Sequence, residues 1–509
     1  MAGHFSGNTF PQTQYFAGFM EPCRFEGEVY DLEVIGEIPK EINGTFYRNM
    51  PDPQVAPFAR DDIWFNGDGN ISAFRIKDGH VDFKQRYVRT EKFEREKEAR
   101  RALIGKYRNP YTDAEPFKIR STANTNIVYF NGKLLACKED SPPYAMNPET
   151  LETLGVETFN GQLKSETFTA HPKLDAVSGE LIGFGYEAKG IATTDICYFS
   201  IGPDGVMTEE LWFKQPQVSM IHDFAVTENW VSNLDELALT CMANSVKVVL
   251  PLIPHICDME QLKKGGEHWY WDPNMPIYFA VLPRRGGKPE DVKYFHAPNA
   301  FPGHTANAYE DTDGNLLVDL SIASENAFDF FPEKDGTTPD MAKLRAPLKR
   351  FTINPHSDVA ELPPAKILLE TSNEFSRIDD RFATRRYRHV FNILMDPTLE
   401  TDFPAVMRTN PGTFFNGIGH LDLETGKLEK WSAGPRAGFQ EPAFIPRSKD
   451  ATEGDGFLIV LVNDYEAMRS KLVIIDVNKF EEPVATVKLP LRLRPGLHGN
   501  WVDAEDLEK

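Results

Sequence analysis

Short runs of β-branched and aromatic residues recur along most of the chain, and this recurrence restricts the fold more than any other feature. Such runs are typical of β-strands, and most of them end at Gly, Asn or Asp, which favour turns. Helical periodicity is scarce by comparison, so we predict an all-β chain. The clearest runs are NIVYFNGKLLAC (126–137), ICYFSI (196–201), IYFAVL (277–282), NLLVDLSI (315–322), GFLIVLV (456–462) and KLVIIDV (471–477).

Several phrases place an acidic or small-residue turn between two predicted strands, so that the second strand returns antiparallel to the first. Imperfect repetition of such hairpins is what a propeller of four-stranded blades produces, because each blade is one meander. A pair of β-sandwich domains would also contain many short strands, so the pattern favours a propeller only moderately. The phrases are NPETLETLG (147–155), DAVSGELIGFG (175–185), GPDGVMTEELW (202–212) and DLETGKLEKW (422–431).

Composition and charge exclude several classes of partner. The chain has 41% hydrophobic and 26% charged residues, which fits a globular protein with a large core. Its formal net charge of -21 repels nucleic acid and anionic membrane surfaces. We therefore expect neither nucleic acid nor a membrane surface as a partner.

Cysteine usage and the N-terminal sequence predict a cytoplasmic protein. The five cysteines are widely spaced and include no C-x-x-C pair, so neither a disulfide framework nor a thiolate metal site is indicated. The first residues, MAGHFSGNTFPQTQYF, contain no basic region followed by an apolar run. No apolar stretch reaches the ~18 residues that a membrane span requires, so we expect no stable membrane insertion.

Residues 232–247, SNLDELALTCMANSVK, interrupt what otherwise reads as a continuous pair of strands. The phrase is helix-like, and it is either a surface loop insertion or a retained intron. Long insertions add little loop-closure entropy, which favours the first interpretation. The second rests on Val231-Ser232, which is how a splice donor of the GTGAGT type is translated.

The twelve histidines contain no HExxH pair and no Cys-His cluster, so a metal site must be assembled from distant strands. Taken singly, each histidine is better explained as a hydrogen-bonded polar residue of a turn or core. Four of them share a distinctive context, because each stands in a short turn-flanked phrase beside β-forming residues. The phrases are TAHPKLD (His171), MIHDFAVTENW (His222), GHTANAYED (His304) and GLHGNWVD (His498).

These four phrases, in this order, resemble the metal-binding histidine motifs of the carotenoid cleavage oxygenases. The resemblance extends from GTFYRNMPDPQ, which begins at Gly44, to the C-terminus. It implies one seven-bladed β-propeller domain over residues 1–509, with loops and helices capping an axial Fe(II) site. His171, His222, His304 and His498 are then the iron ligands, and dioxygen is a second substrate.

Two further histidines test this assignment. His296 lies eight residues before His304 and is the main rival for the third ligand position. His255, in IPHI, is assigned to a structural role with the rest. A structure that placed His296 on the axis would contradict the predicted ligand set.

The resemblance also assigns residues around the ligands. Imidazole ligands need an acceptor for their second N–H, and the family uses glutamates for this. The matching contexts are Glu139 in CKEDSPPYAM, Glu374 in NEFSRIDDRF and Glu441 in FQEPAFIPR, each of which would otherwise read as a surface carboxylate. Thr125, in TANTNIVYF, resembles a threonine near the open coordination position that limits the approach of dioxygen and substrate.

Two residues indicate the substrate. Lys138, before Glu139, and Tyr107, in GKYRNPYTD, resemble the lysine and tyrosine that bind the 4-hydroxyl of stilbenoids in the lignostilbene-dioxygenase branch. Without the resemblance, they read as a solvated lysine and an ordinary loop aromatic. An ammonium and a phenol beside the substrate phenol favour its deprotonation, and the phenolate then pushes electron density into the central alkene.

We therefore predict an Fe(II) dioxygenase that cleaves the central double bond of 4-hydroxystilbenes, such as resveratrol or piceatannol, into two aromatic aldehydes. The charged segment EKFEREKEARRALIGKYRN lacks the apolar patch that carotenoid-cleaving relatives use at membranes, which favours a water-soluble substrate. A carotenoid or apocarotenoid oxygenase is the first alternative. An inactive propeller that binds without catalysis is the second, because the 232–247 segment begins ten residues after His222.

Overall fold

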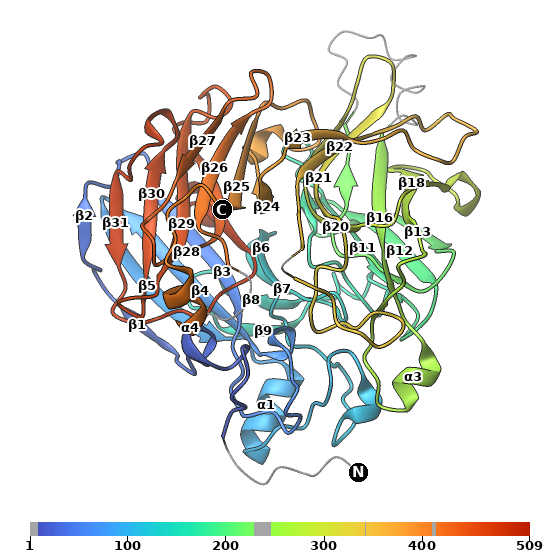
Figure 1. Cartoon of the computed structure of the whole chain (residues 1–509), viewed down its shortest axis with the longest axis horizontal. Helices are drawn as coiled ribbons and strands as arrows, with labels where there is room; N and C mark the ends of the chain where they lie inside the picture. The colour runs from blue at the N-terminus through green and yellow to red at the C-terminus, as the bar shows by residue number, and fades with distance from the viewer. Residues whose placement is uncertain (1–8, 229–245, 342, 410–413, 509) are drawn as a thin grey trace.

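The computed structural model describes residues 9–228, 246–341, 343–409 and 414–508. Within them, the strands form seven antiparallel sheets arranged as the blades of a propeller (Figure 1). This confirms the predicted seven-bladed all-β fold. The four hairpin phrases are also confirmed, since each joins two antiparallel strands.

Three blades follow one another along the chain after the N-terminal sheet. The first consists of β6 (Asn126–Phe130), β7 (Lys133–Cys137), β8 (Tyr144–Met146) and β9 (Thr153–Val156). The second consists of β10 (Lys173–Leu174), β11 (Leu181–Tyr186), β12 (Asp195–Ile201) and β13 (Met207–Lys214). The third consists of β14 (Ser219–Met220), β15 (Ala225–Val226), β16 (Lys247–Ile256), β17 (Tyr270–Trp271), β18 (Ile277–Pro283) and β19 (Lys293–Ala297).

Two regular blades come next. One consists of β20 (Phe301–Glu310), β21 (Leu316–Ala323), β22 (Leu348–Ile353) and β23 (Lys366–Leu369). The other consists of β24 (Ser372–Arg377), β25 (His389–Met395), β26 (Gly417–Asp422) and β27 (Leu428–Trp431).

The remaining two blades each combine strands from both ends of the chain, which closes the ring. One contains β1 (Gly27–Val29), β3 (Gly44–Pro51), β4 (Gly69–Lys77), β5 (His80–Tyr87) and β32 (Gly499–Asp503). The other contains β28 (Ala437–Pro446), β29 (Gly456–Asp464), β30 (Arg469–Asp476), β31 (Ala485–Lys488) and β2 (Val34–Gly36). The closure strand β32 pairs with β3 from Gly44 opposite Asp503 to Arg48 opposite Gly499.

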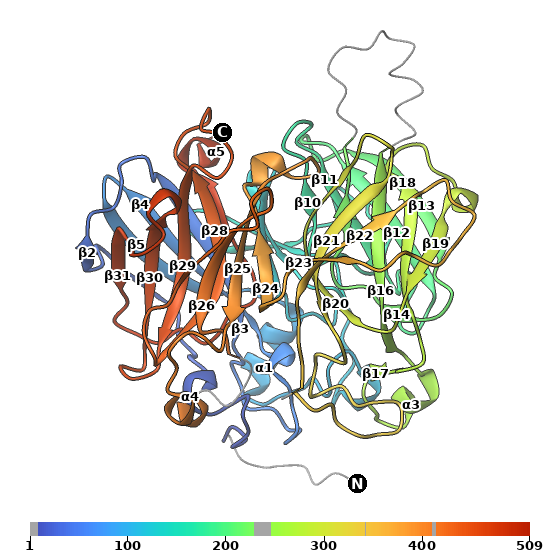
Figure 2. The same cartoon turned by 45° about the horizontal axis from the view of Figure 1, so that its top comes forward.

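Helices are few and short. Helices α1, α3 and α4 gather with the N-terminal segment on one side of the propeller, and α5 lies on the other side (Figure 2). The α-helices are α1 (Glu91–Ala99), α3 (Met259–Lys263), α4 (Phe403–Thr409) and α5 (Ala504–Leu507). The 3-10 turns are η1 (Gly18–Met20), η2 (Trp64–Asn66), η3 (Pro110–Thr112), η4 (Pro289–Asp291), η5 (Asp380–Phe382) and η6 (Val477–Lys479). In the described part of the chain, no helix combines the length and apolar character needed to cross a bilayer.

The apolar core lies between neighbouring blades. Phe74 of β4 and Ile474 of β30 belong to one such layer, for example, and Phe391 of β25 and Val460 of β29 belong to another. Strands buried on both faces explain why the sequence contains continuous apolar runs and little strict alternation. The inner strands meet around the axis, where β20 contacts β24, β24 contacts β28, β28 contacts β32, and β32 contacts β6.

The interrupted strand pair of the sequence is β15 and β16, in which Ala225 is opposite Val249. The Thr227 N–H donates to the Lys247 carbonyl at 2.9 Å, so the chain leaves and re-enters the blade at one point. Most of the predicted insertion, residues 232–245, lies outside the described residues, and both interpretations of it stay predictions.

We expect removal of residues 499–509 to lower the unfolding temperature by roughly 10 °C, because the deletion removes β32 and leaves one edge of β3 without its partner strand, although β3 still pairs with β4. Removal of residues 504–509 is the control, since it deletes α5 but keeps β32. Differential scanning calorimetry measures both. Equal unfolding temperatures for the two truncations would contradict closure by β32.

Candidate metal centre

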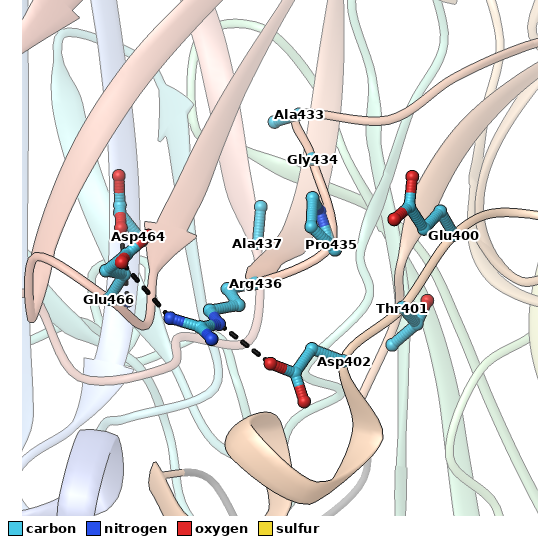
Figure 3. A pocket seen from close by; sticks show the side chains of 10 residues that line it. All are labelled: Glu400, Thr401, Asp402, Ala433, Gly434, Pro435, Arg436, Ala437, Asp464 and Glu466. Carbon is cyan, nitrogen blue, oxygen red and sulfur yellow. Dashed lines mark hydrogen bonds and ion pairs between the residues drawn. The ribbon is translucent and has the colours of Figure 1, made fainter.

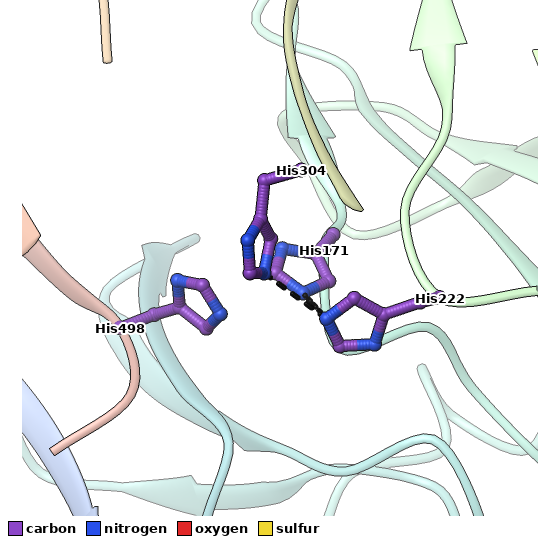
Figure 4. A group of neighbouring side chains, drawn as sticks. All are labelled: His171, His222, His304 and His498. Atoms are coloured by element: carbon purple, nitrogen blue, oxygen red, sulfur yellow. Dashed lines mark hydrogen bonds between the residues drawn. The ribbon is translucent and has the colours of Figure 1, made fainter. Parts of the chain in front are cut away.

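Four histidine side chains from four different blades converge on the propeller axis (Figure 4). The Nε2 atom of His222 lies 3.2 Å from that of His171 and 3.0 Å from that of His304. The His498 ring centroid lies 4.4 Å from that of His171. Two imidazole nitrogens bound at right angles to one ion, each at ~2.1 Å, would be roughly 3 Å apart. The spacing therefore fits a group that could hold a metal ion.

Irregularities in the pairing of the inner strands redirect the side chains of His304 and Glu441. The pairing register of β20 with β21 shifts on both sides of Thr305, next to His304. The register of β28 with β29 shifts between Phe439 and Pro442, around Glu441. Such irregularities bend a strand and redirect its side chains. The local sequence therefore turns these groups toward the axis.

Carboxylates orient three of the four imidazoles through their Nδ1 atoms. Glu139 binds His222, Glu374 Oε2 lies 2.5 Å from His304 Nδ1, and Glu441 Oε1 lies 3.0 Å from His498 Nδ1. No such carboxylate pairs with His171 among the described residues. Fixing Nδ1 leaves Nε2 free to bind a metal, so each pair sets both the tautomer and the direction of its ring.

The pKa values of His171 and His498 favour neutral imidazoles, whereas the pKa of His304 is shifted in the other direction. Burial, together with the neighbouring histidines, holds the pKa of His171 well below its usual value. Burial also lowers the pKa of His498. Burial alone would lower the pKa of His304, but the Glu374 carboxylate raises it instead. Neutral imidazole is the form that binds transition metals.

Gly303 and Phe375 complete the surroundings of His304. A side chain at residue 303 would displace the Glu374 carboxylate from His304, because its Cβ would lie 1.9 Å from Glu374 Oε1. The Phe375 ring stacks on His304 with centroids 4.7 Å apart, and its backbone adopts a φ of 52°. Nothing in the sequence indicated a role for Phe375 beyond its position after Glu374.

Asp223 is a second residue that sequence reasoning missed. Its carboxylate accepts hydrogen bonds from the Lys173 ammonium at 2.6 Å and from the Thr305 N–H at 2.8 Å. Asp223 follows His222, and its partners are close in sequence to His171 and His304. One buried carboxylate therefore ties together the segments that carry three of the histidines.

Lys138 and Tyr107 lie together and are buried. The Lys138 ammonium is 4.8 Å from the centroid of the Tyr107 ring, and it donates to the Phe65 carbonyl at 3.2 Å and to Asn124 Oδ1 at 3.1 Å. Burial lowers the pKa of Lys138 to about 8. The interpretation of Lys138 as a solvated surface lysine is therefore wrong.

Thr125 connects this lysine to the histidine cluster. Its carbonyl accepts from the His498 N–H at 3.2 Å, and its hydroxyl donates to Asn124 Oδ1 at 3.2 Å. The same Asn124 oxygen accepts from Lys138. Asn124 thus lies between two predicted site residues, a role that its place in TANTN did not reveal.

Arg108 is a fourth residue that the sequence did not indicate. Its guanidinium donates to the Tyr186 hydroxyl at 2.5 Å, and that hydroxyl donates to Glu139 Oε2 at 2.6 Å. Arg108 also pairs with Glu187, and its carbonyl lies 3.0 Å from His268 Nδ1. Glu187 and His268 form a second possible metal-binding group with Cys257. The charge of Arg108 already neutralises Glu187 there, which disfavours a cation.

The histidines expected to be structural do not belong to the axial group in the part of the chain that the structure describes, which leaves out His4. His296 is on β19, the outermost strand of its blade, so it is not a rival for the third position. His255 is fully buried on β16, and its Nε2 lies 3.0 Å from Asn326 Oδ1.

A surface cleft with a volume of about 580 Å³ contains none of the predicted site residues (Figure 3). Arg436 crosses it, 2.9 Å from Asp402 and 3.1 Å from Glu466. These ion pairs occupy the Arg436 guanidinium, which is the one cationic side chain among the described residues that line the cleft. The histidine group lies at the axis and not in this cleft.

Comparison with known proteins gives near full-length matches. The family model described as retinal pigment epithelial membrane protein matches residues 20–503. Resveratrol cleavage oxygenase 1 of Aspergillus fumigatus is 53% identical, covering 98% of this chain and 97% of that protein. Carotenoid cleavage oxygenase 1 of Neurospora crassa is also 53% identical, covering 98% and 93%. The crystal structure of Pseudomonas brassicacearum lignostilbene dioxygenase is 43% identical with a TM-score of 0.91, covering 98% and 100%.

We expect Glu374→Gln to weaken binding of a divalent transition metal by about 10- to 100-fold, because an amide orients the His304 ring less firmly than a carboxylate. Metal content after dialysis against a graded chelator measures this. The control is Glu370→Gln, which changes an exposed glutamate shortly before β24. Equal metal retention in both variants would exclude Glu374 from the site.

Proposed function

Since this chain belongs to the family of the retinal pigment epithelial membrane protein and the carotenoid cleavage oxygenases, we propose that it is an Fe(II) dioxygenase that cleaves the central double bond of 4-hydroxystilbenes. The products are two aromatic aldehydes, and each receives one atom of dioxygen. The relatives named as resveratrol cleavage oxygenases and lignostilbene dioxygenases support this substrate class. We further propose that the protein acts in the cytoplasm.

The observation that carries the proposal is the buried pair of Lys138 and Tyr107. A buried ammonium is unfavourable unless a charged or polar partner faces it, and a phenolate supplies such a partner. The next residue, Glu139, binds His222. In this proposal, adjacent residues would serve the substrate phenol and the metal ligand, so the phenol would bind close to the reaction centre.

Four neutral imidazoles suit Fe(II), with coordination positions left for other ligands. His171, His222, His304 and His498 would hold the ion, and Glu139, Glu374 and Glu441 would orient three of them. When bound, Fe(II) supplies the electrons that activate dioxygen. The residues of the chain bind the substrate in one orientation and control its protonation.

Lys138 and Tyr107 bind the 4-hydroxyl of the substrate in this proposal. With its pKa lowered by burial to about 8, Lys138 accepts the phenol proton more readily when uncharged, and the resulting ammonium stabilises the phenolate. The phenolate increases the electron density of the conjugated alkene. Thr125, which contacts His498 through its carbonyl, would limit the direction from which dioxygen and substrate approach.

A carotenoid substrate is the second candidate, because the Neurospora crassa relative is named a carotenoid cleavage oxygenase. A polyene hydrocarbon offers nothing to the Lys138 ammonium, and its binding would leave that charge without a new partner. The buried lysine therefore favours a phenolic substrate. An inactive binding propeller could keep the oriented histidines, but it does not explain the buried pair of Lys138 and Tyr107.

We expect Lys138→Met to reduce cleavage of resveratrol at least about 100-fold while iron content stays constant, because the variant keeps the histidines but loses the phenol partner. The enzyme is reconstituted with Fe(II) without oxygen, then mixed with resveratrol in air, and aldehydes are identified. The control is Lys133→Met, at the start of β7, the strand that ends just before Lys138.

Retention of full activity in Lys138→Met would contradict the phenol site. A wild-type enzyme that holds iron and cleaves a carotenoid but no hydroxystilbene would select the second candidate. Iron binding without cleavage of either class would favour a binding protein.

The pH dependence of kcat/KM gives a separate test. The productive complex forms from uncharged Lys138 and a protonated phenol, so kcat/KM should rise with pH through about 8 and fall near the phenol pKa of ~10. Burial is the main cause of the lowered value, Asp140 and Glu139 oppose it, and Arg108 and Arg120 reinforce it. In Lys138→Met, the rise near pH 8 should disappear. An unchanged profile in this variant would contradict the proton transfer.

A further inference from the structure

The loop at residues 324–331, SENAFDFF, follows β21 and is rich in aromatic residues. Its rings join those of Phe65 and Tyr107 in one continuous cluster, which we call the aromatic wall. Ring centroids within it are 5.1 Å apart for Phe65 and Phe330, and 5.6 Å apart for Tyr107 and Phe331. The members of the wall are Phe65, Tyr107, Phe328, Phe330 and Phe331.

The aromatic wall is adjacent to the lysine assigned to the substrate phenol. The Lys138 ammonium lies 4.8 Å from the Tyr107 centroid and 5.9 Å from the Phe65 centroid. Phe65, Phe328 and Phe330 are only partly buried. Partly exposed aromatic faces beside a phenol-binding cation suit the planar rings of a stilbene.

Asn326 anchors the loop on its inner side. The Asn326 amide donates to the Phe331 carbonyl at 2.8 Å, and its oxygen lies 3.0 Å from His255 Nε2. Both Asn326 and His255 are buried. This end of the loop is therefore fixed to the blade that carries β16.

Asp329 anchors the loop on its outer side, and its partners come from the other end of the sequence. The Tyr15 hydroxyl donates to Asp329 Oδ1 at 2.6 Å, and the Gln14 amide donates to Asp329 Oδ2 at 2.5 Å. The Tyr15 ring also meets Phe330 edge-on, with centroids 5.9 Å apart. Residues 13–20, which we call the N-terminal strap, thus touch the aromatic wall directly.

A fully buried arginine holds the strap in place. Arg494 donates to the carbonyls of Tyr15 and Met20, the second at 2.8 Å, and to the Pro51 carbonyl at 2.5 Å. A buried guanidinium satisfied by carbonyls of separate segments fixes those segments relative to one another. The strap is therefore part of the rigid structure, and so is its contact with Asp329.

We propose that Asp329 is a positioning residue for substrate: bonded to Tyr15 and Gln14, it holds the aromatic wall in the shape that accepts the rings of the stilbene. This inference rests on the proposed function and names the element that shapes its substrate site. Asp329 acts through the wall, because its own carboxylate is occupied by the strap. Loss of the hydrogen bonds from Tyr15 and Gln14 to Asp329 should make the loop between Asn326 and Phe331 more mobile. Metal binding should stay unchanged.

The test compares Tyr15→Phe with Tyr387→Phe. Tyr15→Phe removes only the hydroxyl and keeps the edge contact with Phe330. Tyr387→Phe removes a Tyr–Asp hydrogen bond of the same 2.6 Å length, to Asp319, outside the aromatic wall. We expect KM for resveratrol to rise about fivefold or more in Tyr15→Phe, with kcat within about twofold and unchanged iron content. Amide hydrogen exchange of residues 324–332 should become faster in the same variant.

A second pair of variants separates positioning from simple destabilisation. Asp329→Asn keeps an oxygen that accepts from Tyr15, so its KM should lie between those of the wild type and Asp329→Ala. Unchanged KM and unchanged exchange in Tyr15→Phe, or an equal change in Tyr387→Phe, would overturn the inference.

The two proposals can fail separately. If the iron-loaded wild type cleaves no hydroxystilbene, the proposed function fails, and the role of Asp329 in binding a stilbene fails with it. If the wild type cleaves resveratrol but the variants match it in KM and exchange, only the positioning role of Asp329 fails.

Discussion

Hydrogen bonds between carboxylates and imidazoles of different blades are the interaction on which the site depends. Glu139 follows β7 but binds a histidine that follows β14, Glu374 on β24 binds His304 on β20, and Glu441 on β28 binds His498 just before β32. Glu139 and Glu441 are buried and Glu374 is partly buried, so each needs further donors to stay ionised. Glu139 accepts from Tyr186, Glu374 from the Phe375 N–H, and Glu441 from the Gly499 N–H at 2.8 Å. The same bonds therefore orient the rings and join the blades.

The features of this arrangement that depend on short stretches of sequence could be predicted. Turn residues between β-forming runs identified the hairpins, and the four histidine phrases identified residues that the structure brings within one group. What could not be predicted are the contacts made across long sequence separations. In the sequence, Asp223 is only the residue after His222, and Arg108 is only a cation next to Tyr107. In the structure both are buried, and their hydrogen bonds join segments that carry site residues. Their roles depend on which strands become neighbours, and no local pattern encodes that.

Lys138 shows how one short segment can serve two chemistries. Directly after β7, Lys138 lies against the rings of Tyr107 and Phe65, whereas Glu139 reaches His222. Burial disfavours the charge on Lys138, which lowers its pKa, whereas the same burial is offset at Glu139 by His222 and Arg108, which keep its pKa low. The same buried environment therefore favours the uncharged form of Lys138 and the charged form of Glu139. A proton acceptor for the substrate and a permanent anion for the metal ligand follow from this difference.

Both ends of the chain meet at the site, and this links its chemistry to complete folding. The N-terminal strap reaches the aromatic wall through Asp329, and Arg494 holds that strap from a position four residues before His498. The strand that follows His498, β32, is also the one that closes the ring by pairing with β3. A chain that has not yet closed therefore lacks a histidine, the anchor of the strap and the outer support of the wall together. Because long-range contacts form late, a metal cannot meet the full set of four imidazoles before the propeller is closed.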